Sequence, residues 1–216
     1  MEVVEQGYEF IQVPEYPLTT IEQVGRTCYK SEDKITDDSA GEFVRRLRDR
    51  GHHAMIEFGV VMVRITTTRS CANAIVRHRH GSFAQESTQY CNYGGKEIEF
   101  VKPVWLPDLE VGIYHSPTRR YGSGVYEWLC AMLNGEGSYK RMINALKFPP
   151  QWAREVLPHS LKTELCVMAN FREWRHIFTL RTSKADQGQT QALFKKMLVD
   201  FREQFPVLFD DIVVDD

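Results

Sequence analysis

The sequence Arg-His-Arg-His-Gly-Ser-Phe-Ala-Gln-Glu-Ser-Thr-Gln-Tyr occupies residues 77–90 and follows directly on an apolar segment, residues 71–76. Its first four side chains carry or can share a positive charge, and Glu86 is the one acid in the stretch. Two arginines separated by one residue can clamp different oxygens of a phosphate or carboxylate, because each guanidinium is a rigid fork of donors. A solvated basic turn is the alternative. The apolar lead-in indicates a helix that delivers the cluster into the structure, which favours an anion site.

The composition is that of an ordinary globular protein. A length of 216 residues fits one large domain, and 43% hydrophobic and 26% charged residues are usual values. The net charge of −2 argues against bulk nucleic-acid binding, so a basic site must be local. The five cysteines form no Cys-x-x-Cys pair, which indicates reduced thiols. The chain has neither a signal-peptide pattern nor an apolar run of the ~20 residues a membrane helix needs, so we expect a cytoplasmic protein without membrane contacts.

Strand and helix patterns lie on both sides of residues 77–90. The predicted strands lie within 2–13, at 60–68 and at 97–104, and the predicted helices at 20–29, 39–50, 116–134, 137–146, 150–157, 172–181 and 185–205. Ser39 and Glu42 form a capping-box pattern at the start of one helix. The β-branched run 60–68 is the clearest strand. The Gly-x-Gly at 122–124 does not follow a strand, as a dinucleotide-binding fingerprint must, and is interpreted as a loop.

A second basic constellation begins near residue 170. At helical spacing, Asn170, Trp174, Ile177 and Arg181 fall on one stripe. Polar groups at both ends of an apolar stripe are costly unless something pairs with them. One interpretation is a buried arginine–carboxylate pair in the core, and the other is that Asn170 and Arg181 face a ligand. Arg154 is a third candidate for contact with an anion, although taken alone it would be read as a surface arginine.

Other kinds of catalytic site find little support in the sequence. The seven histidines include no His-Glu-x-x-His motif and no pairing with cysteine at zinc spacing, so no metal site is expected. No Gly-x-Ser-x-Gly elbow surrounds a serine, and no cysteine lies in an activating context. Anion-binding patterns without a nucleophile favour an enzyme that borrows its chemistry from a cofactor.

Several segments together resemble the flavin-dependent thymidylate synthases, the thymidylate synthase complementing protein family. Arg-His-Arg at 77–79, followed after seven residues by Ser87, is similar to the signature of that family. The further matching segments, in the right order and spacing, are 51–53, 153–158, 170–175 and 180–184. The resemblance extends from about residue 20 to residue 212.

The resemblance implies a fold and an activity. With the strand and helix patterns it predicts an α+β fold, a central, mostly antiparallel sheet flanked by helices, in a single domain over residues 1–216 whose acidic tail from about 210 is frayed. The implied reaction is methylation of dUMP to dTMP, with FAD as cofactor and NADPH and methylenetetrahydrofolate as co-substrates. The family's members are homotetramers whose active sites combine residues of more than one subunit.

The resemblance also assigns roles to individual residues. The residues implied to contact FAD are Arg77, His78, Arg79, Gln85, His52, the backbone around Ala54, Asn170, the backbone of Phe171 and Arg172, and His176. The residues implied to bind dUMP are Arg77, Gln85, Glu86, Ser87, Thr88, Gln89, Arg154 and Arg181, of which 86–88 would come from a neighbouring subunit. Arg181 would face the pyrimidine, where a cation stabilises negative charge developing at N3 and so raises electron density at C5, the carbon that is methylated.

The chain departs from the family's pattern at several positions. Gln89 stands where the family usually has arginine, which removes a fixed charge from the expected phosphate site. Ala74, Phe58 and the pair 187–188 also replace polar or histidine-containing positions. These departures leave two alternatives to methylation of dUMP. One is action on another pyrimidine nucleotide, or its hydroxymethylation, and the other is a non-catalytic protein that binds nucleotides or RNA.

Overall fold

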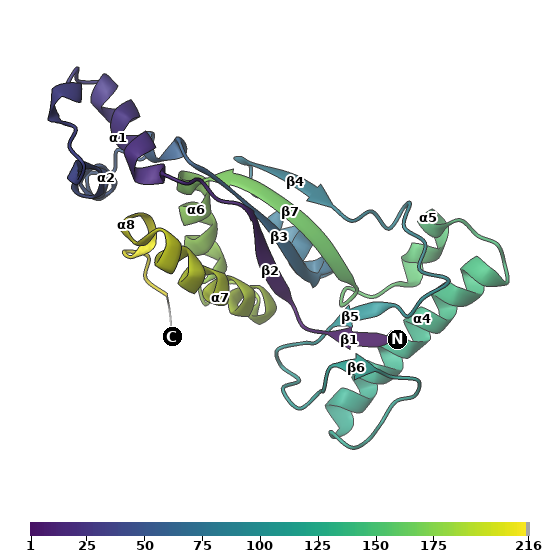
Figure 1. The fold of residues 1–216 in the computed structure, drawn as a ribbon. Coiled ribbons are helices and arrows are strands. Elements are labelled where there is room, and N and C mark those ends of the chain that lie inside the picture. Colours follow the sequence, from purple (N-terminus) through teal and green to yellow (C-terminus); the bar gives the residue numbers. More distant parts are fainter. Residues whose placement is uncertain (215–216) are drawn as a thin grey trace. The chain divides into compact units, whose positions relative to one another are not determined.

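The computed structural model describes residues 1–214 and contains both strands and helices (Figure 1). The strands are β1 (Glu2–Val4), β2 (Gly7–Gln12), β3 (Val60–Thr68), β4 (Gly81–Gln85), β5 (Glu99–Val101), β6 (Gly112–Ile113) and β7 (Lys162–Asn170). The helices are α1 (Pro17–Thr27), α2 (Ser39–Asp49), α3 (Arg69–Ile75), α4 (Ser123–Asn144), α5 (Pro150–Ala153), α6 (Phe171–Arg181), α7 (Gly188–Gln204) and α8 (Pro206–Phe209), with short 3-10 turns at Glu32–Lys34, Met55–Glu57 and Arg154–Val156. The predicted α+β class is confirmed. None of the helices in residues 1–214 has the length and apolar character needed to span a membrane.

The strands form two sheets. Three short strands are ordered β5-β1-β6, with β1 parallel to β5 and antiparallel to β6. Four longer strands are ordered β2-β3-β7-β4. Hydrogen bonds from Arg69 to Leu161 at one end and from Phe171 to Gly59 at the other show that β3 and β7 run antiparallel. The mostly antiparallel sheet expected from the sequence is therefore present.

The chain divides into two compact units, each made of three segments. The first unit contains residues 1–7, 65–77 and 84–165, and the second contains residues 8–64, 78–83 and the chain from 166 onward. The strands β3, β4 and β7 contribute residues to both units. The single domain expected over residues 1–216 stays a prediction.

The core of the first unit lies between α4 and the three-stranded sheet. Val3 of β1 and Phe100 of β5 are buried in one cluster with Trp128 and Leu129 of α4. Figure 1 shows α4 extending past these short strands. Burial of such side chains contributes roughly 1.5–3 kcal/mol each, so the long helix and the small sheet stabilise one another.

The core of the second unit is a cluster of aromatic rings. Trp174 and Phe178 of α6 pack against Phe201 of α7, with ring centroids 5.1 and 4.8 Å from that of Phe201. Phe10 of β2 lies 5.2 Å from the same ring, and the Trp174 indole donates a hydrogen bond to the carbonyl of Val61 in β3. These contacts hold α6 and α7 against one face of the sheet (Figure 1). The contacts of Trp174 and Phe178 thus hold α6 in place against α7 and β3.

Some predicted elements differ from the observed ones. Residues 116–146 were expected to form two helices with an early break at 122–124, whereas a single helix, α4, begins at Ser123 and continues through Gly135. The helix continues because Gly135 lies in close contact with Pro158, so packing there offsets the weak helix propensity of glycine. Ser39 does not cap α2. The N-cap is Asp38, and the Ser39 hydroxyl donates to Glu22 instead. The capping-box expectation was wrong at this residue.

The acidic tail is better ordered than expected. The carboxylate of Asp210 is paired with Arg48, and Asp211 accepts two hydrogen bonds of 2.7 Å from Arg175. Ile212 is only 7% exposed. The prediction of a frayed tail is therefore wrong for residues 210–212, because two partly buried arginines hold the carboxylates. Residues 215–216 lie outside the described part of the chain.

Gly59 is the residue at which we expect a small substitution to damage the fold most. A Cβ atom at position 59 would overlap the fully buried ring of Phe171. We expect Gly59→Ala to lower the free energy of unfolding by about 1–3 kcal/mol, the usual effect of overpacking, in urea denaturation. Gly41→Ala is the matched control, since nothing lies within 4 Å of its added methyl group and alanine favours the helix. Equal stability of the two variants would contradict the prediction.

Candidate functional site

Residues 77–90 leave α3 through an exposed turn. The Thr68 hydroxyl caps α3 by accepting a hydrogen bond of 3.0 Å from the Cys71 amide, and the helix ends at Ile75. Arg77 and Arg79 are exposed, whereas His78 between them is buried. The solvated-turn alternative thus describes the two arginines in this structure, and His78 is the member of the motif that enters the interior. Residues 81–85 then form β4, a strand that the sequence did not predict.

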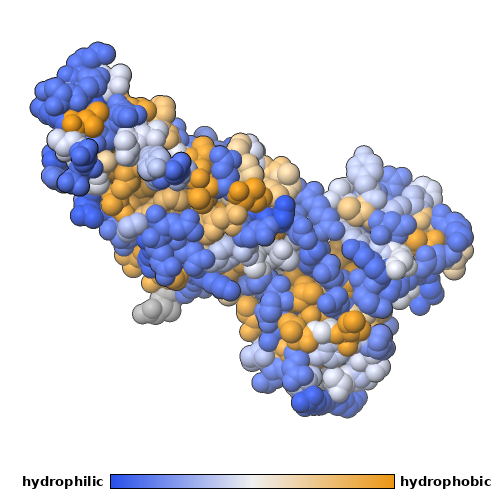
Figure 2. All heavy atoms as spheres, viewed as in Figure 1, coloured by the Kyte–Doolittle hydropathy of each residue, from blue (hydrophilic) through white to orange (hydrophobic). Residues whose placement is uncertain are grey.

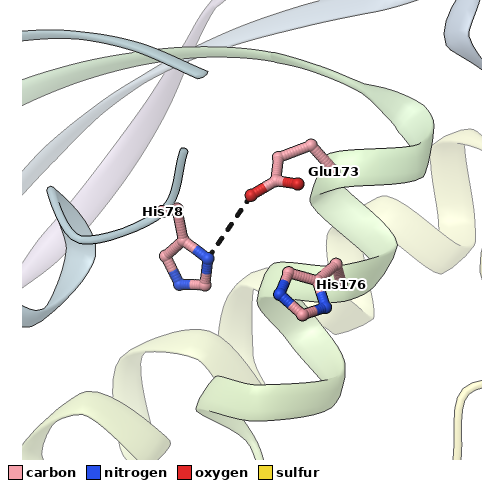
Figure 3. Close-up of side chains that lie close together, drawn as sticks. All are labelled: His78, Glu173 and His176. Atoms are coloured by element: carbon pink, nitrogen blue, oxygen red, sulfur yellow. Dashed lines mark ion pairs between the residues drawn. The ribbon is translucent and has the colours of Figure 1, made fainter. Parts of the chain in front are cut away.

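His78 lies in a cluster with Glu173 and His176 of α6, shown in Figure 3. The Arg181 Nε donates a hydrogen bond of 3.0 Å to the His78 Nε2. The other ring nitrogen of His78, Nδ1, lies 3.4 Å from a Glu173 oxygen. The rings of His78 and His176 meet edge to face with centroids 5.7 Å apart. We call these four residues the His78 cluster, and it joins the Arg-His-Arg motif to Arg181.

The surroundings of His78 favour its neutral form. Burial first, and then the neighbouring Arg181 and His176, lower the pKa of His78 to about 4. Asp186 acts in the opposite sense. Protonation of this imidazole would place a second positive charge beside the Arg181 guanidinium in a site with little solvent. His78 is therefore a hydrogen-bonding group at neutral pH rather than a cation.

The stripe predicted along α6 has a mixed outcome. Trp174 and Ile177 are fully buried, as expected, and Arg181 ends the helix. Arg181 also forms an ion pair of 3.2 Å with Asp186, with side chains 16% and 13% exposed, so the arginine–carboxylate pair that was one interpretation is present. Asn170 is the N-cap, and its Oδ1 accepts from the Glu173 amide at 2.9 Å. That bond leaves its Nδ2 able to donate to a ligand.

A cavity of ≈ 540 Å³ opens beside the start of α6. It brings together three residues that the sequence assigned to flavin, Asn170, Arg172 and His176. The other residues that line it are His53, Glu57, His80, Glu173, Arg175 and Thr179. A smaller cavity of ≈ 310 Å³ shares Glu57, His80 and Asn170 with it and adds Arg79. These guanidinium and amide donors suit a phosphorylated cofactor with polar ring edges, so the residues fit FAD.

Two predicted flavin contacts lie elsewhere in the second unit. His52 lines a separate cavity of ≈ 420 Å³ with Arg26, Tyr29, Phe43, Arg46, Leu47 and Arg50. Ala54 is exposed and precedes the short turn at Met55–Glu57. Phe171 is buried in the core as the first residue of α6. The structure therefore does not bring His52 or Ala54 into the cavity lined by Asn170.

The nucleotide end of the motif borders a different cavity, of ≈ 340 Å³, within the first unit. Thr88 and Arg154, both predicted to bind dUMP, line it together. Arg69, Asn73 and His159 also line it, and the sequence interpretation missed all three. The available signal was position, because Arg69 comes directly after strand β3 and opens α3. Arg69 donates to the Glu86 carbonyl at 3.0 Å, so it is tied to the motif through the backbone.

The remaining predicted nucleotide residues are held by internal hydrogen bonds. The Gln85 amide donates to Thr163 at 3.4 Å, and the Ser87 hydroxyl accepts from the Gln89 amide at 3.3 Å. One oxygen of Glu86 accepts from the Tyr93 hydroxyl at 2.8 Å, while its other oxygen is buried and has no hydrogen-bond partner within residues 1–214. Gln89 is exposed and is not among the residues that line the cavity of Arg69 and Arg154. The cavity nevertheless contains two arginines, Arg69 and Arg154, beside Thr88, the residue that precedes Gln89.

Comparisons with known proteins place these features in a family. Residues 9–207 match the family described as thymidylate synthase complementing protein. A flavin-dependent thymidylate synthase from Corynebacterium aurimucosum is 32% identical over 88% of this chain and 78% of its own length. The flavin-dependent thymidylate synthase of Mycobacterium tuberculosis strain H37Rv is 30% identical over 95% of this chain and 87% of its own.

Solved structures agree with these sequence matches in fold. Thymidylate synthase X from Helicobacter pylori, solved with FAD and dUMP, superposes with a TM-score of 0.75 at 19% identity and covers 96% of this chain and 98% of its own. The UMP/dUMP methylase PolB from Streptomyces cacaoi, solved with 5-Br dUMP, gives a TM-score of 0.74 at 20% identity, with coverage of 97% and 96%. The chain therefore belongs to the thymidylate synthase complementing protein family, the flavin-dependent thymidylate synthases, which are enzymes of the methyltransferase type.

Proposed function

We propose that this protein binds FAD and converts dUMP to dTMP, with methylenetetrahydrofolate as the carbon donor and NADPH as the reductant. The observation that carries the proposal is the hydrogen bond between His78 of the Arg-His-Arg motif and Arg181, in a chain of this family. Bound FAD would supply the reducing equivalents. The protein's own part is to hold the nucleotide and to stabilise charge on the pyrimidine, which requires no protein nucleophile.

For the flavin, we propose the cavity beside the start of α6. Asn170 Nδ2, Arg172 and His176 would hold polar groups of FAD there, with Arg79 at the adjoining cavity. The exposed Arg77 would contact FAD or the nucleotide, as the resemblance implies. His52 and Ala54 would reach a flavin only if the loop that carries them moves, because His52 lines another cavity in this structure.

For the nucleotide, we propose that the cavity of Arg69 and Arg154 binds the phosphate of dUMP. Two guanidinium groups and the Thr88 side chain offer several donors to phosphate oxygens. Ser87 and Gln85 would contact the sugar or base. Arg181 would face the pyrimidine, where its fixed positive charge stabilises negative charge at N3 and so increases electron density at C5.

A homotetramer with shared active sites would complete this arrangement. The residues proposed for the phosphate and those proposed for the pyrimidine belong to different units of the chain. Large aromatic side chains are also exposed in the first unit, Trp105 by 65% and Trp152 by 57%. Figure 2 also shows hydrophobic areas among a mostly hydrophilic surface. Exposed aromatics of this kind are enriched where subunits meet, and light scattering of the purified protein would give the number of subunits.

Two measurements test the proposed function. The purified protein should retain flavin absorbance after it is mixed with FAD and the free FAD is removed, and it should form dTMP from dUMP in the presence of methylenetetrahydrofolate, FAD and NADPH. Protein that stays colourless with FAD, or that forms no dTMP under these conditions, would contradict the proposal.

A second candidate substrate is another pyrimidine nucleotide, above all UMP. Two observations favour it: the replacements at Gln89 and Ala74, and the fold shared with a methylase named for UMP as well as dUMP. Product masses from a panel of UMP, dUMP and dCMP would separate methylation from hydroxymethylation and identify the base. The non-catalytic alternative predicts RNA affinity that falls steeply with salt, so failure to bind RNA at low salt would remove it.

A further inference from the structure

We propose that Glu173 is a positioning residue, which fixes the tautomer of His78 and through it the orientation of the Arg181 guanidinium. This inference rests on the proposed function, because it assigns Arg181 to the pyrimidine. Glu173 was absent from the residues expected from the sequence. It lies on α6 one turn before His176 and is only 4% exposed.

The carboxylate of Glu173 is incompletely paired. Its Oε1 is buried and has no hydrogen-bond partner among the described residues. The His78 Nδ1 lies 3.4 Å from this oxygen, about half an ångström beyond the usual N–H···O length (Figure 3). Leaving a buried carboxylate oxygen without a donor is costly, and a proton on Nδ1 removes that cost with a small shift of one side chain.

The contact on the opposite side of the His78 ring, with Arg181, independently indicates the same tautomer. Arg181 Nε is always a donor, since the guanidinium does not lose its proton in proteins. It lies 3.0 Å from His78 Nε2, which must therefore accept and carry no proton. In the neutral ring the single proton is then on Nδ1, facing Glu173. The other tautomer would set two donors against each other at Arg181 and two acceptors against each other at Glu173.

The same atoms could be taken for a metal site, and the tautomer argues against that. Ligand atoms of His78, Glu173 and His176 all lie within 4.8 Å of one another. A cation held by the His78 Nδ1 would move the proton to Nε2 and break the hydrogen bond from Arg181. Metal binding at the His78 Nδ1 and the observed hydrogen bond from Arg181 thus exclude one another. The observed hydrogen bond favours the positioning role of Glu173.

The orientation of Arg181 matters because its positive charge must lie close to the pyrimidine to stabilise negative charge there. The contacts of the guanidinium include those of Nε with His78 and of Nη1 with Asp186. Asp186 is an anion and partly offsets the positive charge of the guanidinium. The neutral His78 orients the guanidinium without reducing its charge. Loss of Glu173 would free the tautomer of His78 and so weaken the hold of His78 on the Arg181 Nε. The expected result is a smaller kcat with little change in the KM for dUMP.

Nitrogen NMR of the histidine rings tests the tautomer directly. A protonated ring nitrogen and a bare one have distinct chemical shifts, and the spectrum of His78→Asn identifies the signal of His78. We expect the wild-type protein at pH 7 to carry the proton on Nδ1. A proton on Nε2, or a doubly protonated ring, would overturn the proposal. This measurement needs no turnover, so it decides even if the protein forms no dTMP.

Three variants then connect the tautomer to activity. Glu173→Leu removes the acceptor and should give mixed tautomers and a kcat about ten-fold lower, the effect of one lost hydrogen bond. Glu173→Gln keeps an acceptor oxygen and should keep both the tautomer and a kcat within about two-fold of wild type. Glu9→Gln, which alters an exposed ion pair with Arg64, is the control for loss of a carboxylate.

The outcomes separate the alternatives. Rescue by glutamine but not by leucine supports positioning through a hydrogen bond. Glutamine and leucine variants that are equally impaired, or a leucine variant equal to wild type in tautomer and kcat, would overturn it. Tight binding of Zn²⁺ to the wild-type protein that Glu173→Gln abolishes would instead establish a metal site and would also overturn it.

Discussion

Replacement of Arg181 by methionine is expected to lower kcat for dTMP formation by about 10²–10³-fold, the largest effect of any single change in this protein. Methionine has a similar length but no charge, so it removes the group proposed to stabilise developing negative charge at the pyrimidine. Loss of one preorganised donor of this kind costs on the order of 2.7–4 kcal/mol in the transition state. Steady-state rates at saturating dUMP measure the effect.

Arg181→Lys refines this prediction. Lysine keeps the positive charge but lacks the Nε–H that His78 accepts. Its kcat should fall by only about ten-fold, between those of wild type and the methionine variant. Arg64→Met is the control, because Arg64 is an exposed arginine paired with Glu9. A methionine variant at 181 with wild-type kcat would exclude a catalytic role for this arginine.

Replacement of Arg69 by methionine is expected to raise the KM for dUMP by roughly ten- to a hundred-fold with a smaller change in kcat. The reason is the loss of a charge-assisted contact to the phosphate, which contributes about 1.5–3 kcal/mol. Arg154→Met should act in the same direction, since both residues line one cavity. Deoxyuridine, which has no phosphate, should bind wild type and variants equally weakly, and this ligand is the control for damage to the rest of the site.

The Gln89→Arg variant tests whether the arginine that the family usually has at this position affects the binding of dUMP. If Arg69 and Arg154 already neutralise the phosphate, the added arginine should leave the KM for dUMP unchanged. A KM lowered by ten-fold or more would show that the two arginines do not compensate for it. If the Arg69→Met variant had the wild-type KM for dUMP, the cavity of Arg69 and Arg154 would not be the phosphate site.

Local sequence patterns predicted the elements whose signals are short-range. The β-branched run 60–68 coincides with β3, and the helix predicted to run to Arg181 is α6. The resemblance assigned His78 and Arg181 to one active site, and the structure joins them by a hydrogen bond. The two element predictions share a cause, since each depends on residues within one strand or one helix. The roles that the resemblance assigns to His78 and Arg181 stay predictions.

The remaining features depend on contacts that no local pattern encodes. Residues 81–85 contain polar side chains and a glycine, and they form β4 only because β7 pairs with them. Arg69 and Arg154 line one cavity although 84 residues lie between them in the sequence. Glu173 gains its role from His78, which lies on a distant segment. Tertiary packing determines all three.

The strand order β2-β3-β7-β4 has a consequence for biosynthesis. The interior strand β7 leaves the ribosome long after its two neighbours, since β4 ends at Gln85 and β7 begins at Lys162. At about 5–20 residues per second, the nascent chain waits on the order of 10 s with the edges of β3 and β4 unpaired. Unpaired edges invite intermolecular pairing. We therefore expect the yield of native protein made by cell-free translation to depend on chaperones that shield these strands until β7 emerges.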